Sequence, residues 1–208
     1  MKTFKKLLLT TLAVGFMTLS SAFTLNNNSD QILSKAWQID TAHSNISFSI
    51  THFFTPVLGA FNNYTADIRF DPNDLVNSSI DVQIDVKSVD TKNQRRDNHL
   101  QSEDFFNAER WPHIKFVSNN IRRTGENSFV ATGKLTIKDV TKDFELPFRL
   151  LGVMDHPMQE NTQVAGITAE ARLNRTDFGV GVGDWAATMV VGDEVSITLN
   201  LELTHKPS

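Results

Sequence analysis

The six histidines of the chain give the first test for catalytic or metal chemistry. They stand at positions 43, 52, 99, 113, 156 and 205. No two of them follow the HxH or HxxxH spacing that places two imidazoles on one face of a strand or helix. A metal site assembled from residues on separate strands stays open, but the sequence gives no support for one. We assign no metal ligand.

A short cluster of reactive residue types occurs at Asp40, His43 and Ser44. A carboxylate, an imidazole and a hydroxyl are the parts of a nucleophile relay. However, three neighbours on one strand cannot form that relay without a sharp turn. No Gly-x-Ser-x-Gly elbow occurs, and the glycines at 179, 181 and 183 lack the spacing of a dinucleotide fingerprint. They predict a mobile loop and a candidate lid, and we assign no catalytic residue.

His52 stands out because of the strand that it ends. Ile46, Phe48 and Ile50 alternate with Ser47, Ser49 and Thr51, and this period of two predicts a strand with one apolar face. His52 has the parity of the apolar residues, so a polar group lies at the end of an apolar row. Two roles stay open for it: contact with a ligand headgroup, or a hydrogen bond to backbone at the strand end.

The first 22 residues predict a secretory signal peptide. Three lysines precede an apolar run from Leu7 to Leu19, and Ser20-Ser21-Ala22 offers small residues for cleavage. We expect residues 23–35 to be a flexible lead-in and residues 36–205 to form one folded domain in the periplasm. No later apolar run has that length, so no transmembrane segment is expected in the mature chain. The sequence has no cysteine, which excludes disulfides and cysteine nucleophiles.

The charge balance argues against nucleic acid as a partner. The formal net charge is −4, and loss of the three leading lysines would make it −7. No basic cluster stands out against this background, so anionic membrane surfaces are also poor candidate partners. A homodimer stays open, because nothing in the sequence decides it.

Alternating rows continue along the chain and predict an all-β fold. Clear rows occupy residues 79–86, 129–137, 144–150, 165–173 and 195–203, and weaker ones 58–70 and 113–121. Asn62-Asn63 interrupts the alternation in the first weak strand, and a bulge is one interpretation of this interruption. Residues 90–109 predict one or two short helices covering one end of the sheet, with an N-cap at Ser102.

Eight or so antiparallel strands can form a sandwich or a closed barrel. Small residues in the inward rows favour a barrel with a lumen, because a sandwich core is filled by large side chains. They are Ala60, Ala66, Ala131, Gly133, Gly152, Ala165, Ala169 and Ala171. The alternative is that aromatic residues from other strands fill the gaps.

Four sequence blocks resemble the YceI family. The first is Trp37-x-Ile39-Asp40-x-x-His43-Ser44-x-Ile46-x-Phe48-x-Ile50-x-His52, followed by Gly59 and Phe61. The others are RRDNHLQSEDFFNAERWPHIKFVS at 95–118, GKLTIKDVTK at 133–142 and NRTDFGV at 174–180. Asp139 stands where the family commonly has glycine. The resemblance spans residues 37–203.

The resemblance implies an elongated, lipocalin-like antiparallel β-barrel of about eight strands. It also implies a bound polyisoprenoid or similar amphiphile, such as an isoprenoid quinone, a polyprenyl phosphate or a fatty amide, with no covalently bound cofactor. Together with the apolar rows it predicts these lumen residues: Ile46, Phe48, Ile50, His52, Val82, Ile84, Phe105, Phe116, Leu135, Ile137, Phe144, Phe148, Ile167 and Phe178. The headgroup candidates are His52, Arg96, Asp97 and Arg175.

Structural roles compete with these assignments. Arg175 and Asp177 could cap a turn or pair with each other, and Phe105 with Phe106 could plug the barrel end. We expect a lipid-binding or lipid-transport protein. The alternatives are an enzyme acting on an isoprenoid lipid, with His52 as base, and a stress-response barrel with a filled core.

Overall fold

The computed structural model describes residues 35–207, and the expected signal peptide lies outside them. The strands are β1 (Ala36–Ile39), β2 (Asn45–His52), β3 (Thr55–Phe61), β4 (Tyr64–Arg69), β5 (Ser79–Asp85), β6 (Val89–Asp90), β7 (His113–Arg123), β8 (Ser128–Ile137), β9 (Val140–Asp155), β10 (Gln163–Asn174) and β11 (Val191–His205). The helices are α1 (Gln94–Gln101) and the 3-10 turns η1 (Val86–Ser88), η2 (Arg175–Phe178) and η3 (Gly183–Ala186).

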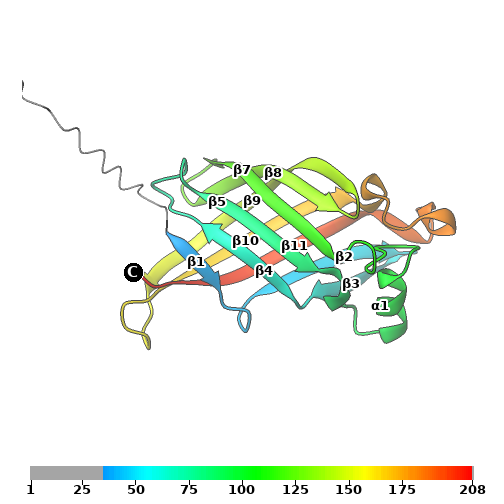
Figure 1. The fold of residues 1–208 in the computed structure, drawn as a ribbon, viewed down its shortest axis with the longest axis horizontal. Coiled ribbons are helices and arrows are strands. Elements are labelled where there is room, and N and C mark those ends of the chain that lie inside the picture. The colour runs from blue at the N-terminus through cyan, green and yellow to red at the C-terminus, as the bar shows by residue number, and fades with distance from the viewer. Residues whose placement is uncertain (1–34, 208) are drawn as a thin grey trace, which may run out of the picture. The chain divides into compact units, whose positions relative to one another are not determined.

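The sheet closes into an antiparallel barrel, which confirms the fold predicted from the small inward residues and the family resemblance. The ring runs β1-β4-β5-β7-β8-β9-β10-β11 and closes where β11 pairs with β1 (Figure 1). β11 is long enough to pair with two strands in succession: residues 203–204 with β1, and residues 191–200 with β2. β2 and β3 thus extend the wall beyond β1 and β4, and eight strand positions surround the interior.

The weak strand expected at residues 58–70 is in fact two strands, so the predicted single strand with a bulge is wrong. The chain leaves β3 at Phe61 and begins β4 at Tyr64. β3 pairs with β2 and β6, whereas β4 pairs with β1 and β5. The two asparagines lie where the strand changes partners, and their side chains accompany this change by reaching Asp90 and Asp85.

The predicted N-cap at Ser102 is also wrong. α1 begins after Asn93, whose side chain accepts a hydrogen bond from the Arg96 backbone N–H, and it ends at Ser102. The Ser102 hydroxyl donates to the carbonyl oxygen of His99 at 2.7 Å. Serine and asparagine satisfy unpaired backbone groups at either end of a helix, so composition alone did not distinguish the two positions.

Aromatic and small residues fill one end of the barrel. The rings of Phe70, Phe129 and Phe148 lie with centroids 5.1 to 5.4 Å apart, and the Trp37 indole N–H donates to the Phe70 carbonyl at 2.8 Å. Ala131, Ala165 and Ala169 are buried in this region. At this end large rings from other strands pack beside the buried small residues, as the alternative of aromatic filling predicted for the gaps.

The other end of the barrel carries α1 and the β2–β3 hairpin, and Figure 1 shows them together at the end opposite the C-terminus. The β10–η2 junction and the beginning of β11 also lie here, because Val191 is paired with His52. We call this the α1 end. Within residues 35–207 no helix has the length and apolar character needed to span a bilayer.

Candidate functional site

A cavity of about 660 Å³ lies inside the barrel at the α1 end. Its volume falls in the range of roughly 300–1,000 Å³ that is usual for small-molecule sites. At about 30 Å³ for each water-sized group, it has room for roughly 20 heavy atoms. Most of its wall is apolar and comes from strands β2, β5, β7, β8, β9, β10 and β11.

Most of the predicted ligand-contacting residues meet in this cavity. Those that line it are Ile46, Phe48, Ile50, His52, Val82, Ile84, Phe105, Phe116, Leu135, Ile137 and Phe144, with Arg96 and Arg175 from the headgroup candidates. Period-two alternation places the strand residues on the inner face. Contact with a ligand stays a prediction for all of them.

Four predicted residues lie elsewhere. Phe148 belongs to the aromatic cluster of the packed end, and Ile167 is buried on β10 opposite Leu201 of β11. Phe178 is buried in η2, with the Lys142 ammonium 5.7 Å from its ring centroid. Asp97 is buried beneath Thr91. Alternation identifies the inner face of a strand but does not tell how deep along the barrel a residue lies.

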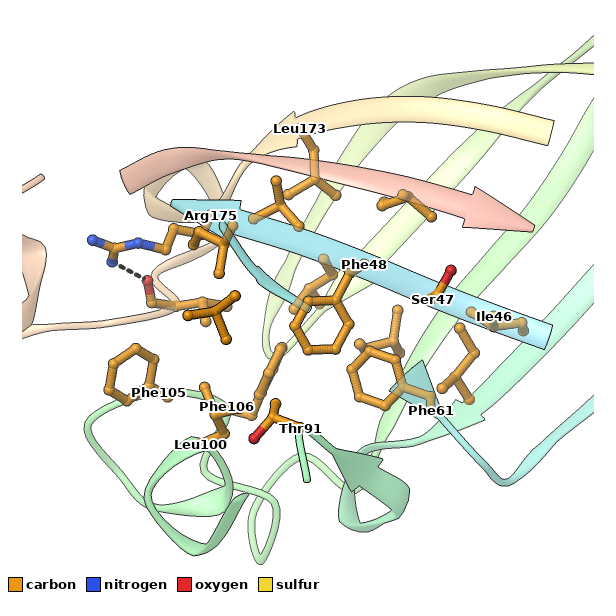
Figure 2. A pocket seen from close by; sticks show the side chains of 18 of the residues that line it. Ile46, Ser47, Phe48, Phe61, Thr91, Leu100, Phe105, Phe106, Leu173 and Arg175 are labelled. Atoms are coloured by element: carbon orange, nitrogen blue, oxygen red, sulfur yellow. Dashed lines mark hydrogen bonds between the residues drawn. The ribbon is translucent and has the colours of Figure 1, made fainter. Parts of the chain in front are cut away.

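The Phe48 ring forms part of the cavity wall. It lies over Gly59 of β3, which is its register partner, and a side chain at position 59 would collide with the ring. Phe61 is 5.5 Å from Phe48, and Phe106 lies 6.1 Å from Phe61. Figure 2 shows these rings extending toward one another from β2, β3 and the segment after α1. Phe105 and Phe106, predicted to plug the barrel end, both line the cavity.

Arg175 lines the cavity, but its guanidinium group is engaged by backbone. Nε donates to the Gly192 carbonyl at 2.8 Å, Nη1 to the Val180 carbonyl at 2.8 Å, and Nη2 to the Val191 carbonyl at 2.9 Å. Burial lowers the pKa of Arg175. The side chain therefore joins η2 to the beginning of β11, and this role agrees better with the turn interpretation than with a free headgroup ligand.

The predicted pairing of Arg175 with Asp177 is not formed. The Asp177 carboxylate lies 3.1 Å from the Lys142 ammonium. The Thr176 backbone N–H and hydroxyl donate to Asp193 instead, at 3.0 and 2.7 Å.

The headgroup candidates on α1 divide into two roles. Asp97 accepts hydrogen bonds from the backbone N–H and hydroxyl of Thr91, and it does not line the cavity. Arg96 donates from Nε to the Thr91 hydroxyl and from Nη2 to the Thr91 carbonyl, both at 2.7 Å, and it does line the cavity. The first turn of α1 thus places the Arg96 guanidinium at the cavity wall, whereas the Asp97 carboxylate holds the segment around Thr91.

Sequence reasoning missed several polar residues at the α1 end. Arg95, Asn93, Thr91, His99 and Trp185 all line the cavity. The His99 imidazole lies 2.9 Å from the Asp104 carboxylate and packs edge-on against Phe105 and Trp185. Their clustering depends on how α1 and the η3 turn fold back over the barrel, which no alternating pattern encodes. The apolar residues of β11 that line the cavity were not predicted as ligand contacts, although the sequence showed them as the alternating row 195–203.

The glycine-rich segment after η2 forms a turn that packs against Arg175 and Lys138. Gly179, Gly181 and Gly183 all have positive φ angles, which favour glycine. A side chain on Gly181 would collide with the Arg175 guanidinium. The Lys138 ammonium donates to the Gly179 carbonyl at 2.6 Å, which joins the β8–β9 turn to this segment. The segment brings Val180 and Trp185 to the cavity wall.

A second polar cluster lies outside the cavity lining. The chain turns sharply after Asp40, and the His43 imidazole Nδ1 comes within 2.9 Å of the Asp40 carboxylate and 3.8 Å of the Glu202 carboxylate. The Asp40 carboxylate raises the pKa of His43, and His43 lowers the pKa of Asp40. The Ser44 hydroxyl does not face His43 but bonds to the Glu202 backbone. The turn therefore makes an ion pair and not a nucleophile relay.

Comparison with known proteins agrees with this architecture. A family model described as "YceI-like domain" matches residues 37–203. A UPF0312 protein of Staphylococcus aureus strain MSSA476 is 31% identical over 168 residues, covering 79% of this chain and 95% of that protein. One of Photorhabdus laumondii is 32% identical over 154 residues, covering 73% and 79%.

Solved structures show the same fold. Burkholderia cenocepacia BcnA is 31% identical with a TM-score of 0.71, covering 79% of this chain and 98% of that one. The Campylobacter jejuni YceI protein is 32% identical with a TM-score of 0.65, covering 81% and 97%. A domain from Saccharophagus degradans, described as polyisoprenoid binding, is 11% identical with a TM-score of 0.61, covering 84% and 100%, and shares the fold. The chain itself belongs to the YceI-like family.

Proposed function

We propose that this protein binds an isoprenoid or similar amphiphilic lipid, with the tail in the barrel cavity and the headgroup at the α1 end. The observation that carries the proposal is the cavity itself, about 660 Å³ of mostly apolar wall with its charged residues gathered at α1 and η2. The relative from Saccharophagus degradans, described as polyisoprenoid binding, supports the same ligand class.

The apolar wall gives the binding energy. Each buried methylene group gains about 0.8 kcal/mol relative to water. A tail of roughly 20 carbons would fill the cavity and gain on the order of 15 kcal/mol before the costs of ordering. The membrane interior offers a lipid the same gain, so a carrier must present a comparably apolar surface. The wall residues Ile46, Ile84 and Leu135 meet this requirement.

The polar end suggests the headgroup chemistry. Arg95 is exposed and lines the cavity, and Arg96 lies beside it. His52 lines the same space and is exposed. Cations near solvent can hold a carbonyl or phosphate oxygen at little desolvation cost. A quinone or a polyprenyl phosphate would satisfy both the wall and this end.

We further propose that the protein works in the periplasm, after cleavage of residues 1–22. The support is the charged, apolar and small-residue order of that segment. Cell fractionation with mass spectrometry of the purified chain tests this point. A mature protein beginning at Phe23 in the periplasmic fraction is the expected result, and an uncleaved chain in the cytoplasm would contradict it.

We propose a carrier or store and not an enzyme. Among the described residues two His–Asp pairs resemble parts of catalytic machinery. The Asp40–His43 pair does not line the cavity, whereas His99, which pairs with Asp104, does. If the cavity held a catalytic base, the candidates would be His52, as expected from the sequence, and His99. His52→Ala should weaken lipid binding modestly, whereas loss of a catalytic base would reduce turnover by about 100-fold or more.

The direct test is mass spectrometry of the organic extract from protein purified from its native compartment without detergent. A stoichiometric isoprenoid or fatty amphiphile is expected, together with uptake of an added isoprenoid quinone by the emptied protein. An empty extract and no uptake would leave the barrel intact and exclude the proposed function.

A further inference from the structure

Two loops at the α1 end expose large apolar side chains to solvent. The β2–β3 hairpin presents Phe53, 56% exposed, and Phe54, 98% exposed, and the segment before β11 presents Met189, 88% exposed. We call these three residues the apolar tip. Single exposed apolar residues are common on protein surfaces, but three on adjoining loops are unusual.

Hydrogen bonds hold the two loops together. The Phe53 backbone N–H donates to the Val190 carbonyl at 2.8 Å, and His52 pairs in register with Val191. Phe53 has a φ angle of 51°, a left-handed conformation that is uncommon for a bulky residue. The hairpin therefore adopts a strained turn that leaves Phe54 fully exposed instead of folding it onto the barrel.

The apolar tip lies in an almost uncharged part of the sequence. Residues 41–66 contain no Asp, Glu, Lys or Arg, and residues 178–192 contain only Asp184. Charged residues make up 21% of the chain, so these two segments differ from the rest. Loops that lack charge gain nothing from anionic lipid, but they can enter an uncharged layer without desolvating ions of their own.

The apolar tip adjoins the cavity. His52, Val57 and Val191 line the cavity and are close neighbours in sequence of Phe53, Phe54 and Met189. The cavity wall and the exposed loops thus share β2, β3 and the beginning of β11. A ligand that leaves a bilayer beside the tip would travel only a short distance through water.

We propose that the apolar tip inserts into the surface of an uncharged lipid bilayer and brings the α1 end of the cavity to the membrane. The proposal rests on the proposed function for what is transferred, but the docking itself needs no bound lipid. Side chains as exposed as Phe54 and Met189 can enter a fluid apolar layer without a matching pocket, unlike most contacts between folded proteins.

A second copy of the chain is the competing occupant. Within residues 35–207, the part of β3 from Thr55 to Gly59 pairs with β2 alone, because β6 reaches only Ala60 and Phe61. Such an edge can pair with another strand. Pro56 interrupts it, since proline lacks the N–H that strand pairing uses. The bilayer is therefore the occupant that we propose.

The test compares three purified proteins: wild type, the tip variant Phe54→Ser/Met189→Ser, and the control Val76→Ser/Met158→Ser. Val76 and Met158 are 95% and 85% exposed and lie in loops at the packed end of the barrel. The control thus removes equally exposed apolar side chains far from the cavity. Flotation with phosphatidylcholine vesicles measures binding, and light scattering measures mass.

A second readout separates docking from lipid binding. Uptake of a short-tailed isoprenoid quinone is measured from vesicles and, separately, from dilute ethanol solution. Burial of one Phe or Met side chain changes a partition constant by roughly 10- to 100-fold. The tip variant should therefore lose at least about tenfold in vesicle binding and in uptake from vesicles. Its uptake from ethanol, and all properties of the control, should stay at wild-type values.

Each other outcome has a definite meaning. Equal vesicle binding by the tip variant and wild type would overturn the proposal. A wild-type dimer that the tip substitutions abolish, without vesicle binding, would assign the surface to a second copy and also overturn it. Vesicle binding through the tip with no quinone uptake by either route would support docking while excluding the proposed function.

Discussion

Filling the cavity from β10 should abolish lipid binding without unfolding the barrel. Ala171 lines the cavity and is half-buried, opposite Ile197 of β11. The substitution Ala171→Phe would place a ring where the tail of a ligand is expected to lie. Ala131 and Ala169 are unsuitable for this purpose, because they are buried in the packed end and do not line the cavity.

The magnitude follows from the cavity volume. The added ring contributes six carbon atoms to a space with room for roughly 20 heavy atoms. If those six positions are lost to the ligand, binding weakens by about 5 kcal/mol, at about 0.8 kcal/mol for each methylene equivalent. This corresponds to roughly three to four orders of magnitude in Kd. The free energy of unfolding should change by less than about 1.5 kcal/mol, because the ring enters space that is already open.

Quinone binding can be followed by the fluorescence of Trp185, which lines the cavity. A matched control is Glu170→Phe, which adds a similar ring on the exposed outer face of the same strand. The control should bind quinone like wild type. Urea unfolding of all three proteins measures stability.

One result would refute the reasoning. If Ala171→Phe is folded and binds quinone within about tenfold of wild type, lipid does not occupy this cavity and the proposed site is wrong. If the variant is strongly destabilised, the interior at this position is packed, and the alternative of a filled barrel would extend to the α1 end.

Three further predictions test other parts of the structure. Ala131→Phe should lower the free energy of unfolding by about 1–3 kcal/mol or more, measured by urea, because Ala131 is fully buried among large residues. Gly181→Ala should lower the melting temperature and displace Arg175, because position 181 has a φ of 79° and no room for a side chain; a wild-type melting temperature would contradict this. His43→Gln should cost stability at a pH of about 5.5 and little at about 8.5, by urea titration. Because the pKa of His43 is raised in the folded protein, its pair with Asp40 stabilises the fold fully at pH values below about 6.5. Because the pKa of Asp40 is lowered, this stabilisation begins to be lost only when the pH falls below about 3.8. A stability difference that does not depend on pH would refute this prediction.

Residue alternation was enough to predict the strands and their inner faces, whereas the choice of a barrel over a sandwich also depended on the small inward residues and the family resemblance. Rows such as Ile46, Phe48 and Ile50 identify the inner face because side chains of a strand alternate between two sides. Ten of the eleven predicted lumen residues that line the cavity come from such rows, including His52 at its polar end, and the eleventh, Phe105, lies after α1. Local patterns predicted element boundaries less well where a polar residue can serve in two structural roles. Ser102 ends a helix that it was expected to begin, and Asn62-Asn63 separates two strands that were expected to be one.

Depth along the barrel was decided only by the tertiary structure. Phe144 and Phe148 share a strand and a face, yet Phe144 lines the cavity and Phe148 packs against Phe70 and Phe129. Whether an inward residue meets open space or another ring depends on strand register and on the residues opposite, which lie far away in the sequence. The sequence by itself determined which side chains face inward, and the closed register of the barrel determined which end is filled and which end is open.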